Sequence, residues 1–390
     1  MALRTTIAAR IREARERLGL TQRDLAERAG FAHHQTVSQI ESGVREVKAW
    51  ELANLARVLH VAIEDLLRAV PLAEPLVLWR QRPDAEDVRR EQEARFHRRC
   101  ARYAFLRQLA GTRPVAALPA PAQPLADLRF EDVEAFAEAV GGMLGLGDYP
   151  AESLARAAED RWGVQIWYED LGRDGSAAAM VADCGPAVLL NAAEAPWRRV
   201  FSLAHELFHL LTWDPVEVTR LADDEVGRRR AEQLANVFAS ALLLPADAVR
   251  RALLRRDRGD GLHPAEVAGL AGEFGVSTPA MLWRLVNLGA LPREGAERLA
   301  RDPGLPSAPV TARWGRPAPL PAEYVRLAYL AHARGDLAKA QLAVYLEVPL
   351  VDVEETLAAY GLSLRESWPA GGAASPRAAA DESLPDTVGL

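Results

Sequence analysis

Cysteine is nearly absent from this chain of 390 residues, which contains only Cys100 and Cys184. Two cysteines exclude a disulfide framework and a four-cysteine zinc ribbon, so any metal site must be built mainly from His, Asp and Glu. No stretch approaches the roughly 20 apolar residues that span a bilayer, and the charged N-terminal stretch lacks the apolar segment of a signal peptide. We therefore expect a cytoplasmic protein.

The chain also has no strong excess of positive or negative charge. The net charge is −7, and 26% of the residues are charged while 49% are hydrophobic. This balance excludes wholesale disorder and is ordinary for a globular protein. Because the chain is too long for one core, we expect two or three domains. A polyanion would have to be bound by a local basic surface.

Hydrophobic periodicity and Pro-rich stretches divide the chain into five segments. We expect, in order, an all-helical domain, a connector helix with a Pro/Ala linker, an α+β domain with a small sheet, a helical C-terminal region and a disordered tail: residues 1–70, 71–126, 127–302, 303–368 and 369–390. The connector is basic, with ten Arg and five acidic residues from Arg80 to Arg113 (10 − 5 = +5). We expect a solvated helix there, and contact with DNA phosphates or with a dimer partner is the alternative.

The strongest chemical signal is His205-Glu206-Leu-Phe-His209. Residues four apart lie on one face of a helix, so both imidazoles can reach one ion. Glu206 can point toward an open coordination position and act as a base on a water molecule. The surrounding residues are almost all apolar, and polar groups in such a helix are costly unless a metal or another partner satisfies them.

A hydrolytic zinc site needs a third protein ligand. Glu232 follows His205 by 27 residues (232 − 205 = 27), which fits a helix, a turn and an antiparallel helix. Asn236, on the same helical face as Glu232, is expected to accept a hydrogen bond from one of the two imidazoles. Four acidic residues of the intervening segment remain rival ligands: Glu217, Asp223, Asp224 and Glu225.

These residues and their surroundings resemble the ImmA/IrrE family of metallopeptidases. The resemblance rests on Phe201-Ser-Leu-Ala-His-Glu-Leu-Phe-His, on Glu232-Gln-Leu-Ala-Asn-Val-Phe-Ala and on Leu242-Leu-Leu-Pro245. It implies a zincin-like fold in which one Zn²⁺ is bound by His205, His209 and Glu232 and Glu206 is the catalytic base. A departure is Phe208, where members commonly carry a small residue. The residue that stabilises the oxyanion stays open among five candidates: Tyr149, Tyr168, Arg198, Arg199 and His263.

The N-terminal segment resembles the repressor-type helix-turn-helix domains of the XRE family. The resemblance rests on Leu18-Gly-Leu-Thr-Gln-Arg-Asp-Leu-Ala-Glu-Arg-Ala-Gly30 and on His34-Gln-Thr-Val-Ser-Gln-Ile-Glu-Ser-Gly43. It implies a buried ion pair between Arg15 and Glu41. A helix-turn-helix that serves only for protein interaction or dimerisation is the alternative.

The second helix of this motif is expected to read DNA. Its polar side chains suit base edges, and a bidentate Gln–adenine contact is one possibility; they are His34, Gln35, Thr36 and Gln39. Gln22, which begins the preceding helix, is expected to bind a phosphate. Residues 1–70 carry eleven basic and nine acidic side chains (11 − 9 = +2). Because so small a positive charge gives one copy only modest affinity for DNA, we expect a homodimer on a two-fold DNA site.

Together the motifs predict a DNA-binding transcription regulator with a zinc-dependent peptidase domain. In the ImmA/IrrE family the peptidase cleaves a repressor in response to stress or mobile-element signals, so the resemblance implies a repressor or antitoxin-like protein as substrate. The alternative is a non-catalytic transcription factor in which the peptidase-like domain is a zinc-stabilised sensor or dimerisation module.

Overall fold

The computed structural model describes the following residues: 2–59, 61, 63–67, 76–81, 85–111, 117–172, 175–182, 184–216, 218, 220, 224–256, 262–305 and 317–364. The chain forms two compact units, Met1–Pro321 and Ala322–Leu390. None of the helices in the part of the chain that the structure describes could span a lipid bilayer. The tail expected over 369–390 lies outside the described residues.

The N-terminal segment is helical, as the sequence predicts, and has a hydrophobic core of buried aliphatic side chains that includes Leu25 and Ile40. Thr21 begins the second helix with a capping box, because Thr21 and Asp24 each accept a hydrogen bond from the other's backbone N–H. Gly30, with φ of 75°, makes the left-handed turn after it. The helices are α1 (Ala2–Arg17), α2 (Gln22–Arg28), α3 (Gln35–Glu41), α4 (Ala49–Val58) and α5 (Ile63–Leu67).

A mixed four-stranded sheet in the order β1-β3-β4-β2 forms the centre of the following domain. Its strands are β1 (Val77–Trp79), β2 (Gln165–Glu169), β3 (Ala177–Ala182) and β4 (Gly185–Asn191). β2 runs parallel to β4, whereas β3 is antiparallel to both β4 and β1. The sequence predicts a small sheet in this domain, but not β1, which comes from the segment that we expected to be a connector.

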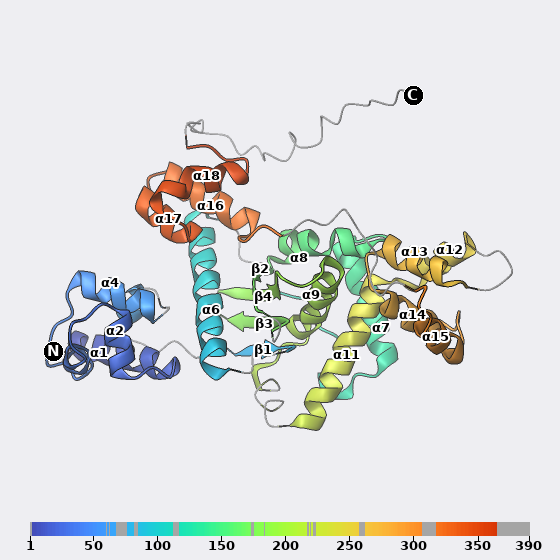
Figure 1. Ribbon diagram of the computed structural model, residues 1–390, viewed down its shortest axis with the longest axis horizontal. Helices are drawn as coiled ribbons and strands as arrows, with labels where there is room; N and C mark the ends of the chain where they lie inside the picture. Colours follow the sequence, from blue (N-terminus) through green and yellow to red (C-terminus); the bar gives the residue numbers. More distant parts are fainter. Residues whose placement is uncertain are drawn as a thin grey trace. The chain divides into compact units, whose positions relative to one another are not determined.

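Helices α6 (Glu86–Leu109) and α9 (Pro196–Leu211) lie on opposite sides of the strands (Figure 1). The apolar stripe of α6, which includes Phe96 and Tyr103, is buried. Arg95 and Arg99 of α6 donate hydrogen bonds of 2.6 and 2.8 Å to the carboxylate of Glu169 on β2. The expectation of a solvated connector helix is therefore wrong, because this helix covers one face of the sheet.

The other helices of this domain contribute side chains to the same hydrophobic core as α9. α11 (Glu225–Leu243) packs against both α9 and α7 (Phe130–Leu144). The remaining helices are η1 (Leu125–Asp127), η2 (Pro150–Glu152), α8 (Leu154–Trp162), α12 (Ala246–Leu254), α13 (Pro264–Phe274), α14 (Thr278–Asn287) and α15 (Arg293–Ala300). The expected fold class, a helical head followed by an α+β domain with a small sheet, is confirmed.

The second unit is a small helical bundle, as expected for the C-terminal region. It contains α16 (Ala322–Ala333), α17 (Lys339–Leu346), η3 (Leu350–Asp352) and α18 (Val353–Ala359). The Tyr324 hydroxyl donates a hydrogen bond of 2.9 Å to the backbone oxygen of Tyr345, which ties α16 to α17.

Candidate metal centre and DNA-reading helix

Helix α9 carries an unusual density of buried polar side chains. From Ser202 to Leu211 every residue is buried, yet this stretch includes His205, Glu206 and His209. Burying such groups costs free energy unless each finds a partner. The helix forms because its sequence is apolar on most sides and has Pro at its first turn, where the missing N–H does no harm.

The three predicted ligands meet at one point. The Nε2 atoms of His205 and His209 are 3.2 Å apart. Glu232, which reaches in from α11, places one carboxylate oxygen 3.1 Å from Nε2 of His205 and the other 3.4 Å from Nε2 of His209. Ligand atoms bound at 2.0–2.1 Å in a tetrahedral zinc site are about 3.3 Å apart. The three side chains therefore fit Zn²⁺ and leave a fourth position for another ligand.

Asn236 holds one of the imidazoles in the orientation that a metal requires. It lies one helical turn beyond Glu232, and its Oδ1 accepts a hydrogen bond of 3.1 Å from Nδ1 of His205. With Nδ1 donating, the lone pair is on Nε2, which faces Glu232 and His209. The sequence prediction of this contact agrees with the geometry.

Burial and mutual contact set the protonation states of the ligands. Burial lowers the pKa of His205 to about 4, so this imidazole is neutral at pH 7 and able to bind a metal. Burial alone would raise the pKa of Glu232, but hydrogen bonds with the two imidazoles hold it well below its ordinary value. At His209 burial lowers the pKa, and the hydrogen bond with Glu232 and the charge of Glu206 outweigh this and raise it.

Glu206 lies beside the ligands but has no partner of its own. Its side chain is fully buried, and within the described part of the chain neither carboxylate oxygen accepts a hydrogen bond. Burial, with a smaller contribution from the charge of Glu232, raises the pKa of Glu206 to about 8. An unpaired carboxyl group inside a core destabilises the fold. Hydrogen bonding within the described residues therefore does not account for its burial.

The rival ligands that the structure describes are engaged elsewhere. Asp224 caps α11, with its Oδ1 3.0 Å from the backbone N of Gly227. Glu225 forms an ion pair with Arg229 one turn further along α11. Glu217 and Asp223 lie outside the described residues.

The candidates for oxyanion stabilisation are also bound to other groups. Tyr149 donates a hydrogen bond of 2.6 Å to Glu273. Arg199 donates to the backbone oxygens of Ala192 and Glu194, and Arg198 forms an ion pair of 3.0 Å with Glu194.

Two further candidates remain. Burial raises the pKa of Tyr168 to about 12, and the backbone N of His263 begins α13 by donating to Glu266. A residue that the sequence did not indicate, Arg80, reaches helix α9 beside the ligand cluster: its Nη1 is 2.8 Å from the hydroxyl of Ser202, one helical turn before Glu206.

Phe208, the departure from the family pattern, points into the core. Its ring centroid is 5.4 Å from that of Phe238 on α11 and 6.0 Å from that of His209. The bulky ring thus fills space between α9 and α11 beside a ligand.

The helix-turn-helix segment buries the ion pair that the resemblance implies. Nε of Arg15 is 2.6 Å from Oε1 of Glu41, whose side chain is fully buried. Gln22 donates a hydrogen bond of 2.9 Å to the other oxygen of Glu41. In this structure the amide of Gln22 therefore joins the ion pair, although we expected it to face a phosphate.

Most of the predicted base-reading side chains are accessible on α3 and just before it. His34, Gln35 and Gln39 are exposed and Thr36 is half-buried, whereas Val37 and Ile40 of the same helix are buried in the core. This division gives α3 one polar face directed away from the domain.

Two family models match parts of this chain. Residues 11–66 match a helix-turn-helix, and residues 159–286 match the IrrE N-terminal-like domain. No curated protein matches the chain. A solved structure of a Mycobacterium tuberculosis transcriptional regulator is similar to it, with 23% sequence identity and a TM-score of 0.31, over 42% of this chain and 49% of that chain. Both predicted resemblances are thus confirmed on a single polypeptide.

Proposed function

We propose that this chain, in which a helix-turn-helix segment precedes an IrrE N-terminal-like segment, is a DNA-binding transcription regulator with a zinc-dependent endopeptidase domain. Its substrate would be a regulatory protein, a repressor or an antitoxin-like partner. The observation that carries the proposal is the meeting of His205, His209 and Glu232 around one point, with the unpaired carboxyl group of Glu206 beside it.

The residues of the site divide the chemical work. His205, His209 and Glu232 would hold Zn²⁺, which would supply a Lewis acid for the carbonyl of the scissile peptide bond. Glu206 accepts a proton from the attacking water and passes it to the leaving amine nitrogen. Asn236 keeps His205 in the tautomer that binds metal.

The helix-turn-helix segment would bring this activity to DNA. The exposed side chains of α3 have the donors and acceptors that base edges in the major groove require. The small positive charge of residues 1–70 supports only modest affinity, so we propose a homodimer on a two-fold site. The partners are then double-stranded DNA, a second copy of the chain and the protein substrate.

Comparison of Glu206→Gln with the wild-type protein tests the peptidase proposal. The two side chains are nearly isosteric, so the variant should bind the same amount of zinc while losing cleavage. Proteins with new N-termini are identified by mass spectrometry in cells that produce either form. The proposal requires at least one cleavage product that is present with the wild type and missing with the variant.

The same comparison tests the non-catalytic alternative. If the two forms give identical sets of N-termini and regulate the same genes equally, the domain is a zinc-stabilised sensor or dimerisation module. In that case removing a ligand with His209→Ala should impair folding rather than catalysis.

A further inference from the structure

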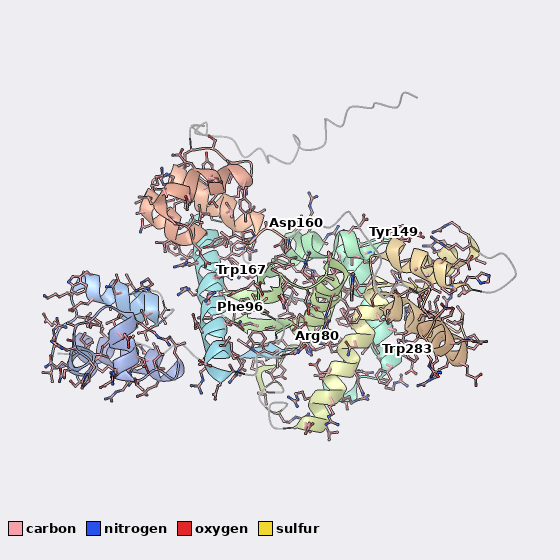
Figure 2. All side chains as sticks on the ribbon, in the orientation of Figure 1. Arg80, Phe96, Tyr149, Asp160, Trp167 and Trp283 are labelled. Carbon is pink, nitrogen blue, oxygen red and sulfur yellow. The ribbon has the colours of Figure 1, made fainter. Side chains whose placement is uncertain are left out.

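Arg80, labelled in Figure 2, follows the edge strand β1 directly. Its backbone N donates a hydrogen bond of 3.0 Å to the oxygen of Ala177 on β3, so the strand pairing continues past Trp79. Successive side chains of a strand point to opposite faces. Trp79 points to the α6 side, where its Nε1 is 2.7 Å from Glu93. Arg80 is therefore directed to the α9 side.

Two residues of α9 fix the guanidinium group of Arg80. Nη1 donates a hydrogen bond of 2.8 Å to the hydroxyl of Ser202. The guanidinium carbon lies 5.3 Å from the centroid of the Phe201 ring, a cation–π contact. Ser202 precedes Glu206 by four residues, so both are on the same face of α9, one turn apart.

The charge of Arg80 acts on the metal centre. Burial lowers the pKa of this guanidinium, and the charges of Glu206, Glu194 and Glu232 counteract that effect. Arg80 nevertheless remains charged, because an Arg side chain does not lose its proton in proteins. Nη1 of Arg80 donates to Ser202, and within the described residues neither oxygen of Glu206 accepts a hydrogen bond, which leaves this carboxylate available to a water molecule.

We propose that Arg80 is a catalytic residue of the metal centre and donates a hydrogen bond to the substrate oxygen that becomes negative during hydrolysis. This inference rests on the proposed peptidase function. When water attacks the carbonyl carbon, one electron pair of the C=O bond moves onto this oxygen. The same electron pair re-forms the C=O bond when the C–N bond breaks. Arg80 stabilises the negative charge without transferring a proton.

The assignment adds a residue from outside both matched segments. Arg80 lies between residues 11–66 and 159–286, in the part of the chain that follows the helix-turn-helix. The peptidase site would then be complete only when β1 is paired with β3. Alternatively, β1 could inhibit the peptidase by blocking its site with Arg80. An inhibitory Arg80 is expected to bind the Glu206 carboxylate directly, and it donates to Ser202 instead.

The test measures anion binding rather than turnover. The full chain is loaded with Co²⁺ in place of zinc, and its visible absorption spectrum is titrated with methylphosphonate, a tetrahedral anion. Neutral imidazole serves as the second probe. Arg80→Gln should weaken methylphosphonate binding about ten- to a hundredfold, as expected for the loss of one charged donor, and should leave imidazole binding unchanged.

Matched variants separate a direct contact from a general effect of charge. Arg198→Gln removes a neighbouring positive charge that is paired with Glu194, and it should change methylphosphonate binding less than about threefold. Ser202→Ala removes the hydroxyl that holds Arg80 and should give an intermediate loss. Arg80→Lys keeps the positive charge but lacks the planar set of N–H donors of a guanidinium group, so it should restore only part of the affinity for methylphosphonate.

Three results would contradict the proposal in distinguishable ways. Equal methylphosphonate affinity in wild type and Arg80→Gln would exclude Arg80 as the oxyanion donor. Tighter methylphosphonate binding by the variant would identify β1 as an inhibitory strand. If the wild type gave no cobalt spectrum, the metal centre itself, and with it the proposed function, would be wrong.

Discussion

The buried carboxylates of this protein differ in whether they have partners. Glu41 accepts hydrogen bonds from Arg15 and Gln22, and Glu51 accepts them from Arg45 and from the backbone N of Lys48. Glu206 accepts none within the described residues. The first two stabilise the helix-turn-helix segment, whereas the burial of the third is the feature on which the proposed role as a base depends.

Glu51 provides a pH-dependent contribution to stability. Burial would raise its pKa, but the hydrogen bonds from Lys48 and Arg45 outweigh burial and hold the pKa below its ordinary value of 4.5. Its contribution is therefore present above the pKa of the unfolded chain and is lost as the pH falls through the folded pKa. Glu51→Gln should destabilise α4 by about 1–2 kcal/mol at pH 7 and by progressively less below pH 4.5.

Hydrogen exchange of α4 peptides in the full chain, measured between pH 3.5 and 7, checks this prediction after correction for the intrinsic exchange rate. The exposed Glu27→Gln serves as the control and should leave protection unchanged. A Glu51 effect of equal size at both ends of this range would contradict the assigned pKa direction.

At the scale of elements, the candidate site shows what sequence can predict. His205 and His209 share a helix, and Glu232 shares another with Asn236, so helical spacing alone indicates which side chains lie on one face. Arg80 could not be found this way. It is 122 residues from Ser202 in the chain, and a three-residue edge strand gives no periodic signal.

The sequence also did not predict that helix α6 is buried against the sheet. Its many arginines suggested a solvated surface, but Arg95 and Arg99 are paired with Glu169 and the buried apolar stripe of the same helix covers the sheet. Pairing with a residue some 70 positions away cannot be deduced from local charge. The presence of a small sheet was easier to predict, because alternating or continuous apolar runs mark buried strands.

Phe96→Ala tests the structural role of α6. The Phe96 side chain is fully buried, so its truncation should destabilise the domain by about 3–5 kcal/mol. Val88→Ala, at a half-exposed position of the same helix, should cost less than about 0.5 kcal/mol. Hydrogen exchange of β2 and β4 gives the readout, and unchanged protection in Phe96→Ala would restore the interpretation of α6 as a connector.

At the scale of the whole molecule, two segments with different chemistry occupy one chain. The helix-turn-helix segment has a polar helix face suited to DNA, and the sheet domain buries a cluster suited to zinc. If Arg80 belongs to the metal centre, the stretch between the segments is part of the peptidase site. Both motifs were recognisable from sequence because each depends on residues close together in the chain.

The double variant Gln35→Ala/Gln39→Ala tests DNA reading. Each lost base contact should cost about 1–3 kcal/mol of specific binding. The affinity is measured by gel shift, at fixed salt, on a genomic fragment that the wild-type protein has enriched. Gln108→Ala makes the same chemical change on α6 and should bind normally. Equal affinity of the double variant and the wild type would favour the interaction-module alternative.

The central claim is that His205, His209 and Glu232 bind zinc, and metal analysis of the purified full chain tests it most directly. The wild type and the exposed-site control His33→Ala should each contain about one zinc per chain, and His205→Ala should contain almost none under the same conditions. A wild-type protein that binds no zinc, or a His205→Ala variant that retains the full amount, would contradict the assignment.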